Sequence, residues 1–262
     1  MPSGGHRHLK RLAASNKWGL EKSGGKYAIR PLPGAHNKDL SIPIHYIITR
    51  FLKLANTSKE VSYILRNGMI LVNGKTLKNH KSVVGLFDVI TVIKSHEHYR
   101  LLLTVTRKFK LQAITSDEAK FRLTKVMKKG NEGITPMTRT LCGYNFRFAN
   151  PSIKVSDTVK VDIETGTIVE NYSFEVGAIV FIYNGSNIGR VGTIKNMETQ
   201  TDGKTLIQLV DGGEKHFTAL QSSSMVIGKD SDILITLDET KGIKLTEYEK
   251  SNLKYQEVAV EE

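Results

Sequence analysis

Cysteine and tryptophan are almost absent from this chain, each occurring once in 262 residues, and proline occurs only six times. With Cys142 alone, no disulfide can form within the chain, which suits a reducing compartment. No apolar run approaches the roughly 20 residues that a membrane-spanning helix requires. The N-terminal residues also lack the apolar stretch of a signal peptide. We therefore expect a cytoplasmic protein without a membrane partner.

Acidic residues are in short supply as well, because 26 Asp and Glu face 38 Lys and Arg and leave a net charge of +12. The excess is unevenly spread: residues 1–43 carry a net charge of +6 and residues 44–173 carry +11, whereas residues 174–242 carry −3 and residues 243–262 carry −2. A charge of this size concerns partners and association rather than fold. The first two thirds of the chain therefore indicate a polyanionic partner.

Recognisable catalytic and metal-binding patterns are also missing. The stretch His96-Glu97-His98 comes nearest to a metal cluster, but no Cys or further His lies at ligand spacing around it, so a solvated turn is the better interpretation. Asp117 and Glu118 belong to a predicted helix start, where carboxylates favour the helix dipole. Cys142 stands in no recognisable nucleophile context. We expect no catalytic residues, no cofactor, no metal and no small-molecule substrate.

Two short helices in tandem are predicted after residue 40. Apolar residues recur at helical spacing over residues 44–55, and Pro43 is tolerated in the first turn. The second helix begins with the capping-box spacing of Thr57 and Glu60 and ends at Asn67-Gly68, where a left-handed backbone is expected. The elements predicted next are a strand at 69–72, a tight hairpin turn at Asn73-Gly74, and a strand at 88–93.

The middle third of the chain is predicted to be rich in strands, with one helix. The capping-box spacing of Thr115 and Glu118 predicts that helix, running towards residue 130. Residues 131–150 have little periodicity and predict a long surface loop. The predicted strands are 99–106 and 111–114, on either side of the basic turn 107–110, and then 155–163 and 167–169.

A glycine-rich loop, NGSNIGRVG from residue 184 to residue 192, lies between two apolar runs. Nucleotide-binding glycine loops need G-x-x-x-x-G-K-[ST] or G-x-G-x-x-G leading into a helix, whereas this stretch has neither spacing and leads into a strand. It instead predicts a turn and bulge in a small barrel. Asn184-Gly185 would reverse the chain, Gly189 would permit a bulge and Gly192 a close strand contact, which leaves Arg190 projecting towards RNA or a protein neighbour.

Two of these stretches resemble known modules. The order helix, helix, strand, turn, loop, strand over residues 41–95 resembles the S-four-type RNA-binding module, and GSNIGRVGTI resembles the KOW motif of SH-three-like barrels. Further stretches, HLKRLAA with Trp18, ITSDEAKFRL, IKVSDTVKVDIETG, VIGK and KGIKL, extend the likeness to the small-ribosomal-subunit protein family S-four-e of eukaryotes and archaea. The resemblance implies a structural, non-enzymatic component of the small (40S or 30S) subunit. Residues 131–148 fit that family poorly.

The expected fold class is α+β in several modules. These are a basic N-terminal extension (1–40), an S-four-like αα-β RNA-binding module (41–95), a central β-rich domain (96–172), a KOW SH-three-like β-barrel (173–220), and a C-terminal segment with an acidic tail (221–262).

The expected partners are small-subunit rRNA and neighbouring ribosomal proteins. RNA is recognised largely by shape and phosphate, which suits long cationic side chains on rigid elements. In the N-terminal extension, expected to become ordered on RNA, Trp18 would pack or stack. The candidate RNA-binding residues are Arg7, Lys10, Arg11, Lys17, Trp18, Arg50, Lys53, Lys59, Arg66, Lys75, Arg107, Lys108 and Arg190. For any single cation, an ordinary solubilising role stays open.

Two other classes of protein stay open on the sequence. A KOW-bearing transcription or ribosome-assembly factor would share the basic surface but serve another process. An RNA-modifying enzyme with an S-four-like module would need a separate catalytic domain with a placed carboxylate or nucleophile, and the β segments offer none.

Overall fold

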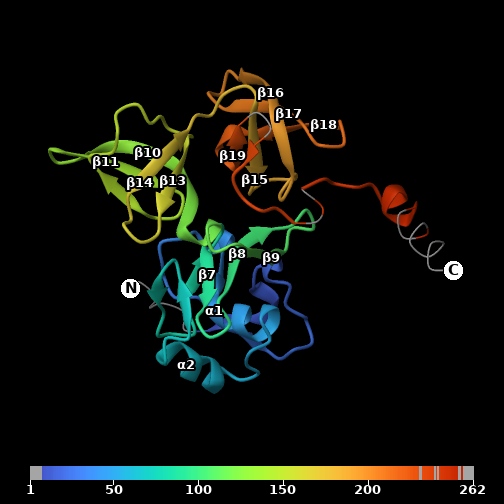
Figure 1. Ribbon diagram of the computed structural model, residues 1–262. Coiled ribbons are helices and arrows are strands. Elements are labelled where there is room, and N and C mark those ends of the chain that lie inside the picture. Colours follow the sequence, from blue (N-terminus) through green and yellow to red (C-terminus); the bar gives the residue numbers. More distant parts are fainter. Residues whose placement is uncertain (1–7, 230–231, 239, 241, 253–254, 256–262) are drawn as a thin grey trace, which may run out of the picture.

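The computed structural model describes residues 8–229, 232–238, 240, 242–252 and 255. Figure 1 shows three parts and a C-terminal segment that extends away from them. We call residues 8–114 the N-terminal lobe, strands β10–β14 the central sheet, and strands β15–β20 the C-terminal sheet. The expectation of a mixed α and β structure is confirmed, and strands predominate.

The N-terminal lobe holds the two α-helices described between residues 8 and 229, α1 (Ile44–Tyr46) and α2 (Ser58–Arg66), and α1 runs on into a π-helical turn, η4 (Ile47–Phe51). Its main sheet has the order β5-β4-β7-β8-β9, and two smaller pairs are β1-β2 and β3-β6. The strand bounds are β1 Leu9–Lys10, β2 Tyr27–Ala28, β3 Ser41–Pro43, β4 Ile70–Val72, β5 Lys75–Thr76, β6 Val83–Gly85, β7 Val89–Val92, β8 Glu97–Leu103 and β9 Phe109–Ile114.

Local sequence signals in this lobe behave as predicted. Thr57 accepts from the Glu60 backbone N–H, and the Glu60 carboxylate accepts from the Thr57 backbone, so the capping box of α2 is complete. Asn73 and Gly74 both have positive φ, 49° and 73°, as the predicted tight hairpin turn requires. Two details differ. Pro43 closes strand β3 beside β6 and stands just before α1 instead of inside it, and the first helical segment ends at Phe51, short of residue 55.

The central sheet corrects two predictions. The helix expected from residue 115 is a single 3-10 turn, η5 (Glu118–Lys120), followed by the long strand β10. The loop expected at 131–150 is occupied by β11 and β12. The Glu118 carboxylate accepts from Thr236, far along the chain, so it is not available to complete a capping box. The strand bounds are β10 Phe121–Glu132, β11 Thr135–Thr140, β12 Asn145–Arg147, β13 Thr158–Asp162 and β14 Ile168–Tyr172, in the order β12-β11-β10-β13-β14.

The C-terminal sheet has the order β18-β17-β16-β15-β19-β20. Its strands are β15 Ala178–Ile182, β16 Val191–Thr199, β17 Thr205–Val210, β18 His216–Leu220, β19 Ser224–Lys229 and β20 Asp232–Ile233. The remaining short helical turns are η1 Arg11–Ala13, η2 Asn16–Trp18, η3 Lys38–Leu40 and η6 Gln221–Ser223. Two of the four expected domain boundaries, 95/96 and 220/221, fall within sheets, since β7 pairs with β8 and β15 pairs with β19.

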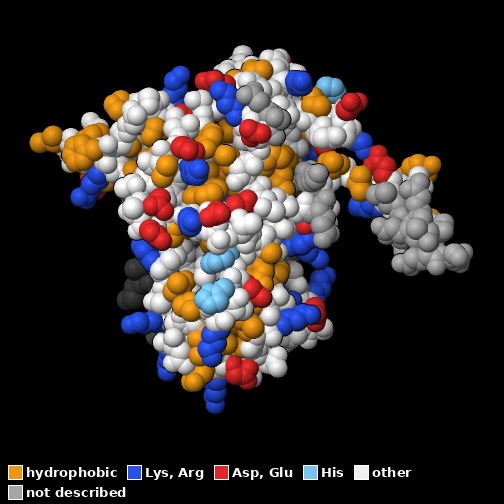
Figure 2. Space-filling view, in the orientation of Figure 1, with side chains coloured by type: hydrophobic (Ala, Val, Ile, Leu, Met, Phe, Trp, Pro, Cys, Tyr) orange, Lys and Arg blue, Asp and Glu red, His pale blue; other side chains and the backbone are white. Residues whose placement is uncertain are grey.

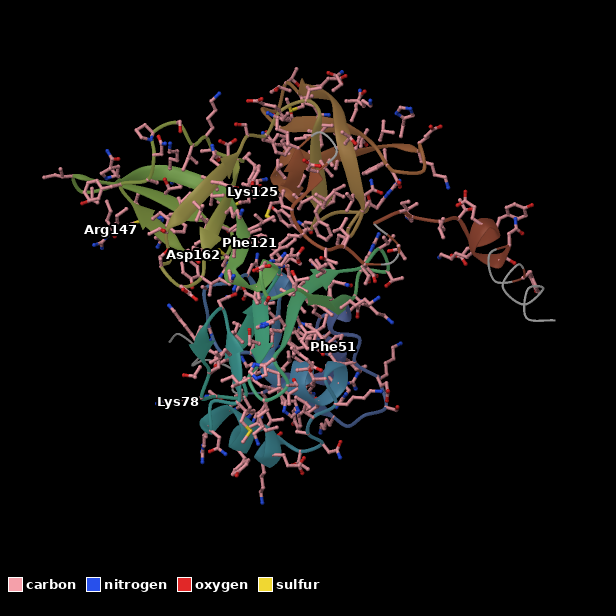
Figure 3. The ribbon with its side chains drawn as sticks, viewed as in Figure 1. Phe51, Lys78, Phe121, Lys125, Arg147 and Asp162 are labelled. Carbon is pink, nitrogen blue, oxygen red and sulfur yellow. The ribbon has the colours of Figure 1, made fainter. Side chains whose placement is uncertain are left out.

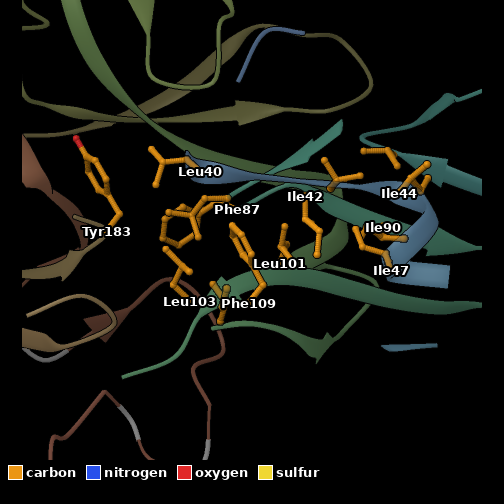
Figure 4. Close-up of a cluster of buried hydrophobic side chains, with 14 of the residues drawn as sticks. Leu40, Ile42, Ile44, Ile47, Phe87, Ile90, Leu101, Leu103, Phe109 and Tyr183 are labelled. Atoms are coloured by element: carbon orange, nitrogen blue, oxygen red, sulfur yellow. The ribbon is translucent and has the colours of Figure 1, made fainter. Parts of the chain in front are cut away.

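One hydrophobic core runs from the N-terminal lobe into the C-terminal sheet (Figure 4). Ile44 and Ile90 are fully buried in the lobe. Phe87 packs edge-on against Phe181 of β15, with 5.3 Å between ring centroids, and Tyr183 belongs to the same cluster. Because burial of apolar surface is the main stabilising contribution to folding, this continuous core fixes the two parts against each other.

Candidate nucleic-acid interface

Helix α2 presents one face to the core and the other to solvent. Val61 and Leu65 are buried at a spacing of four residues, so Lys59 and Arg66 lie exposed on the outer side. Lys53 is also exposed, on the segment between the helices, with φ of +52°. In Figure 2, Lys and Arg side chains stand out at the lower end of the molecule, where the N-terminal lobe carries α2. Because these three side chains are already exposed, they can contact a polyanion without any change in the fold.

Three of the predicted cations instead donate hydrogen bonds to backbone carbonyls of the N-terminal extension, one of them, Arg50, from the helical region that follows it. Arg50 donates from Nη1 to the Gly19 carbonyl at 2.9 Å, and Arg11 donates from Nε to the Gly25 carbonyl at 3.0 Å. Lys17 donates to the Asp39 carbonyl at 2.9 Å. Partial burial lowers the Lys17 pKa, and the nearby Asp39 carboxylate opposes this. These side chains hold backbone carbonyls of the extension in place.

Trp18 is a structural residue of the same extension. It is 2% exposed, and its indole N–H donates to the Ser41 carbonyl at 2.8 Å. Its ring packs against Tyr46 with 5.8 Å between centroids. The packing alternative for Trp18 is therefore the one found, and Trp18 anchors the extension to the hydrophobic core. Arg7 lies outside the described residues.

Four further predicted cations, Lys10, Lys75, Arg107 and Lys108, are exposed. Lys10 ends strand β1, and Lys75 opens β5, with its ammonium 5.9 Å from the centre of the Tyr144 ring. Arg107 and Lys108 form the turn between β8 and β9. Arg107 donates from Nη2 to the Ser186 carbonyl at 3.1 Å, so this basic turn contacts the glycine loop of the C-terminal sheet.

Arg190 does not project from the glycine loop as predicted. It is 7% exposed, it forms an ion pair with Asp211 at 2.9 Å, and its guanidinium lies 3.7 Å from the centre of the Phe217 ring. Burial between an ion-pair partner and an aromatic ring removes it from the surface that RNA could touch. The prediction was wrong because the sequence gives no sign that Asp211 is brought opposite.

Gly192 plays the part predicted for it, whereas Gly189 allows a close contact between loops and no bulge is found at it. Gly192 lies where a Cβ would stand 2.9 Å from the Val210 carbonyl oxygen, so the neighbouring strand approaches closely. Gly189 has φ of +80°, and a Cβ there would stand 2.3 Å from the Thr104 carbonyl group. The loop therefore docks against the turn between β8 and β9. It is a structural contact between two parts of the protein.

A buried ionic cluster joins the N-terminal lobe to the central sheet, and the sequence reasoning missed it. Asp88 contacts Arg122 at 3.1 Å and His36 at 2.9 Å, and both Asp88 and Arg122 are buried. Burial alone would raise the pKa of Asp88, but the Arg122 guanidinium and the contact with His36 hold it well below its usual range. Arg122 lies between the apolar residues Phe121 and Leu123 of a strand. A cation in such a position is the sequence signal that could have indicated a buried ion pair.

Other kinds of site find no support in the described part of the chain. Within the residues that the structure describes, no three His, Cys, Asp or Glu side chains are grouped to hold a metal ion. Among those same residues, no helix has the length and apolar character needed to cross a membrane. His96 to His98 lie at the turn into β8, where Thr91 shares a hydrogen bond with His98.

Comparisons with known proteins agree on one family. The Ribosomal family S4e model matches residues 95–168, and the RS4NT (NUC023) domain model matches residues 3–39. The small ribosomal subunit protein eS4 of Dictyostelium discoideum is 37% identical over 254 residues, covering 96% of this chain and 95% of that protein. The eS4A protein of Schizosaccharomyces pombe is 36% identical over 248 residues, covering 94% of each.

A solved structure shows the same likeness. The crystal structure of the 30S ribosomal protein S4e from Thermoplasma acidophilum aligns with a TM-score of 0.63 at 27% sequence identity, covering 75% of this chain and 99% of that one. Together with relatives matched over nearly their full length, this shows that the chain belongs to the S4e family of small-subunit ribosomal proteins.

Proposed function

We propose that this protein is a structural constituent of the small ribosomal subunit and acts in translation by binding rRNA. The observation that carries the proposal is the near full-length identity to proteins named small ribosomal subunit protein eS4. The strongly basic first two thirds of the chain and the exposed cations on α2 support it physically, because neutralising phosphates contributes much of the affinity for nucleic acids. The protein would work in the cytoplasm on ribosomes, without catalysing a reaction.

The principal RNA contact would be the outer face of the tandem-helix region. Lys53, Lys59 and Arg66 are exposed there, and Lys75 lies on the hairpin that follows α2. We propose that this part of the N-terminal lobe is an S-four-type module and that the C-terminal sheet is a KOW barrel. Cations fixed on short, capped elements lose little freedom when they bind, which suits recognition of RNA shape and phosphate.

Neighbouring ribosomal proteins are the second class of partner. The last third of the chain carries a net negative charge and is a poor RNA surface. The acidic end, residues 257–262, falls outside the described residues. The alternative functions, a KOW-bearing transcription or assembly factor and an RNA-modifying enzyme, are not favoured by the names of the relatives.

Sedimentation tests the proposed function. A tagged copy expressed in cells should move with small subunits and translating ribosomes through a density gradient and should remain with them after a wash at moderate salt. An assembly factor would move only with precursor particles. Protein that stays at the top of the gradient in cells depleted of the native copy would contradict the proposal.

A further inference from the structure

The central sheet is an open half-barrel whose two edge strands face the same cleft. Within the described residues, β12 pairs only with β11 and β14 pairs only with β13. Residues 145–150, around β12, and residues 166–171, around β14, line opposite sides of a cleft of about 610 Å³. The sheet thus leaves a hollow with two unpaired strand edges, outside every RNA contact proposed above.

The lining of this cleft combines apolar rings with amide groups. Phe146, Ile153 and Ile168 belong to or pack against the apolar core of the central sheet, while Asn145 and Asn171 supply amide donors and acceptors. Phe148 also lines the cleft and is 75% exposed. Its backbone is held at φ of +53° and its N–H donates to the Pro136 carbonyl at 3.1 Å.

The exposure of Phe148 has no explanation in the packing of this chain. A left-handed backbone is unfavourable for a bulky side chain, and exposing a phenyl ring forfeits the gain from burying it. The backbone hydrogen bond to Pro136 nevertheless fixes the residue at the rim of the cleft. An aromatic ring exposed to solvent at a fixed backbone position is a surface on which a nucleobase can stack.

Three exposed cations share the outer face of the sheet, the face opposite the Phe146 ring, and of these Arg147 also lines the cleft. Lys128 of β10 lies opposite Arg139 of β11, and Arg147 of β12 lies opposite Met137 of β11. Side chains two residues apart on a strand share a face, so Arg139 and Met137, and with them Lys128 and Arg147, project to the same side. All three cations are exposed, and none is in an ion pair within the part of the chain that the structure describes. In Figure 3, Arg147 lies at the outer end of this sheet.

We propose that the open edge of the central sheet is a single-stranded RNA site, in which Phe148 and the cleft take unpaired bases while Lys128, Arg139 and Arg147 take phosphates. The inference rests on the proposed function and deepens it by adding a second site with a different RNA class. Bases of a duplex are stacked and paired, so only a single strand can place one in the cleft. An acidic peptide would satisfy the cations but would leave the exposed ring and the amides without a partner.

The test is binding of the full-length protein to a fluorescent 12-nucleotide single-stranded RNA and to a duplex RNA of equal length. Phe148→Ala should weaken single-strand binding about tenfold, because base stacking on an aromatic ring is lost, and should leave duplex binding unchanged. Phe148→Trp should restore the affinity. Ile134→Ala is the matched control, since Ile134 is 99% exposed on the same sheet at the tip of the β10–β11 hairpin.

The cations have their own readout. Changing Lys128, Arg139 and Arg147 together to Gln should lower the slope of log affinity against log salt for the single strand by about 2, at about 0.7 for each phosphate released. Lys154→Gln, an exposed cation on the loop between β12 and β13, should change little. Wild-type single-strand binding by Phe148→Ala, or equal losses for single strand and duplex, would overturn the inference. The proposed function would survive either result, because sedimentation with small subunits tests it separately.

Discussion

Arg190 shows how a single side chain changes role between sequence and structure. Seen in the sequence, it is a cation in a glycine loop, whereas in the fold it neutralises Asp211, whose side chain is fully buried. Breaking a buried pair leaves an uncompensated charge, which costs more than the pair itself contributes. Arg190 therefore stabilises the fold, although it lies in the stretch that resembles an RNA-binding motif.

Replacement of Arg190 should separate the two roles. Arg190→Met is expected to lower the free energy of unfolding by about 3 kcal/mol, since Asp211 would remain buried without its partner. The affinity of the folded variant for RNA should stay at the wild-type value. Urea unfolding and RNA binding measure the two quantities, and Lys195→Met, an exposed cation on the neighbouring strand β16, serves as the control. Weaker RNA binding with unchanged stability would contradict this assignment.

The burial of Lys125 at the junction of two sheets should make the free energy of unfolding depend on pH. It is 1% exposed on β10, and its ammonium donates to the carbonyls of Gln221 at 2.5 Å and Ser224 at 2.8 Å. Burial lowers the pKa of Lys125 to about 8 from 10.5. Since the folded pKa lies below the unfolded one, the cost of burying the charge is fully present below pH 8 and disappears as the pH rises to 10.5.

The free energy of unfolding of the wild type should therefore rise between pH 8 and pH 10.5, relative to a Lys125→Met variant, by up to about 3 kcal/mol. Taking the difference between the two proteins removes the titration of all other groups. Urea unfolding at several pH values gives the measurement. A difference that is flat across this range would show that Lys125 keeps an ordinary pKa in the fold.

At the scale of elements, contacts between loops decide how the parts of the protein meet. The glycine loop reaches the turn between β8 and β9 through Gly189, whose missing Cβ leaves room for the Thr104 carbonyl. Gly185 has a similarly positive φ of +94°, but nothing lies within 4 Å of the position of its missing Cβ. Both glycines have a left-handed backbone, but only Gly189 lies against another part of the chain.

Substitution of these glycines isolates that contact. Gly185→Ala should destabilise the protein by about 1 kcal/mol, the strain of a left-handed backbone. Gly189→Ala adds a clash with the Thr104 backbone and should cost several times as much, because the loop and the turn must separate. Thermal unfolding of the two variants compares them directly. Equal effects would mean that the loop moves away from the turn at no cost.

Strand β10 is the element where local signals misled. Thr115 and Glu118 have the spacing of a helix start, and only the first half of the capping pattern forms, with the Glu118 N–H donating to Thr115 at 3.4 Å. The Glu118 carboxylate serves Thr236, and the residues that follow pair on both sides, with β11 and with β13. A strand with two neighbours gains more from those ladders than a short exposed helix gains from its propensity.

For the whole molecule, the distribution of charge predicts how RNA binding depends on salt. The exposed cations Lys53, Lys59 and Arg66 lie around α2. Arg50, an equally good candidate in the sequence, instead donates a hydrogen bond to the Gly19 carbonyl. Changing the three exposed cations to Gln should reduce the salt slope of rRNA binding by about 2 to 3, since each phosphate contributes about 0.7 to 0.9.

A matched variant controls for net charge. Lys195, Lys204 and Lys229 are equally exposed but lie on the C-terminal sheet, where the surrounding chain is mildly acidic. Changing these three to Gln removes the same charge and should leave the salt slope nearly unchanged. Filter binding or fluorescence anisotropy over a series of salt concentrations measures both slopes. Equal slopes for the two triple variants would remove the α2 face from the interface.

The sequence by itself determined the family, the charge distribution, the tandem helices and the tight turns. These depend on contacts between near neighbours, such as Thr57 with Glu60, or on backbone angles that Asn73 and Gly74 adopt readily. Only the tertiary structure decided that Arg190 and Trp18 are buried and that residues 121–147 form three strands of one sheet. Those outcomes depend on partners such as Asp211 and Ser41, which lie about twenty residues away along the chain. A local sequence pattern does not determine which distant residue will pack against a side chain, and the burial of that side chain depends on this partner.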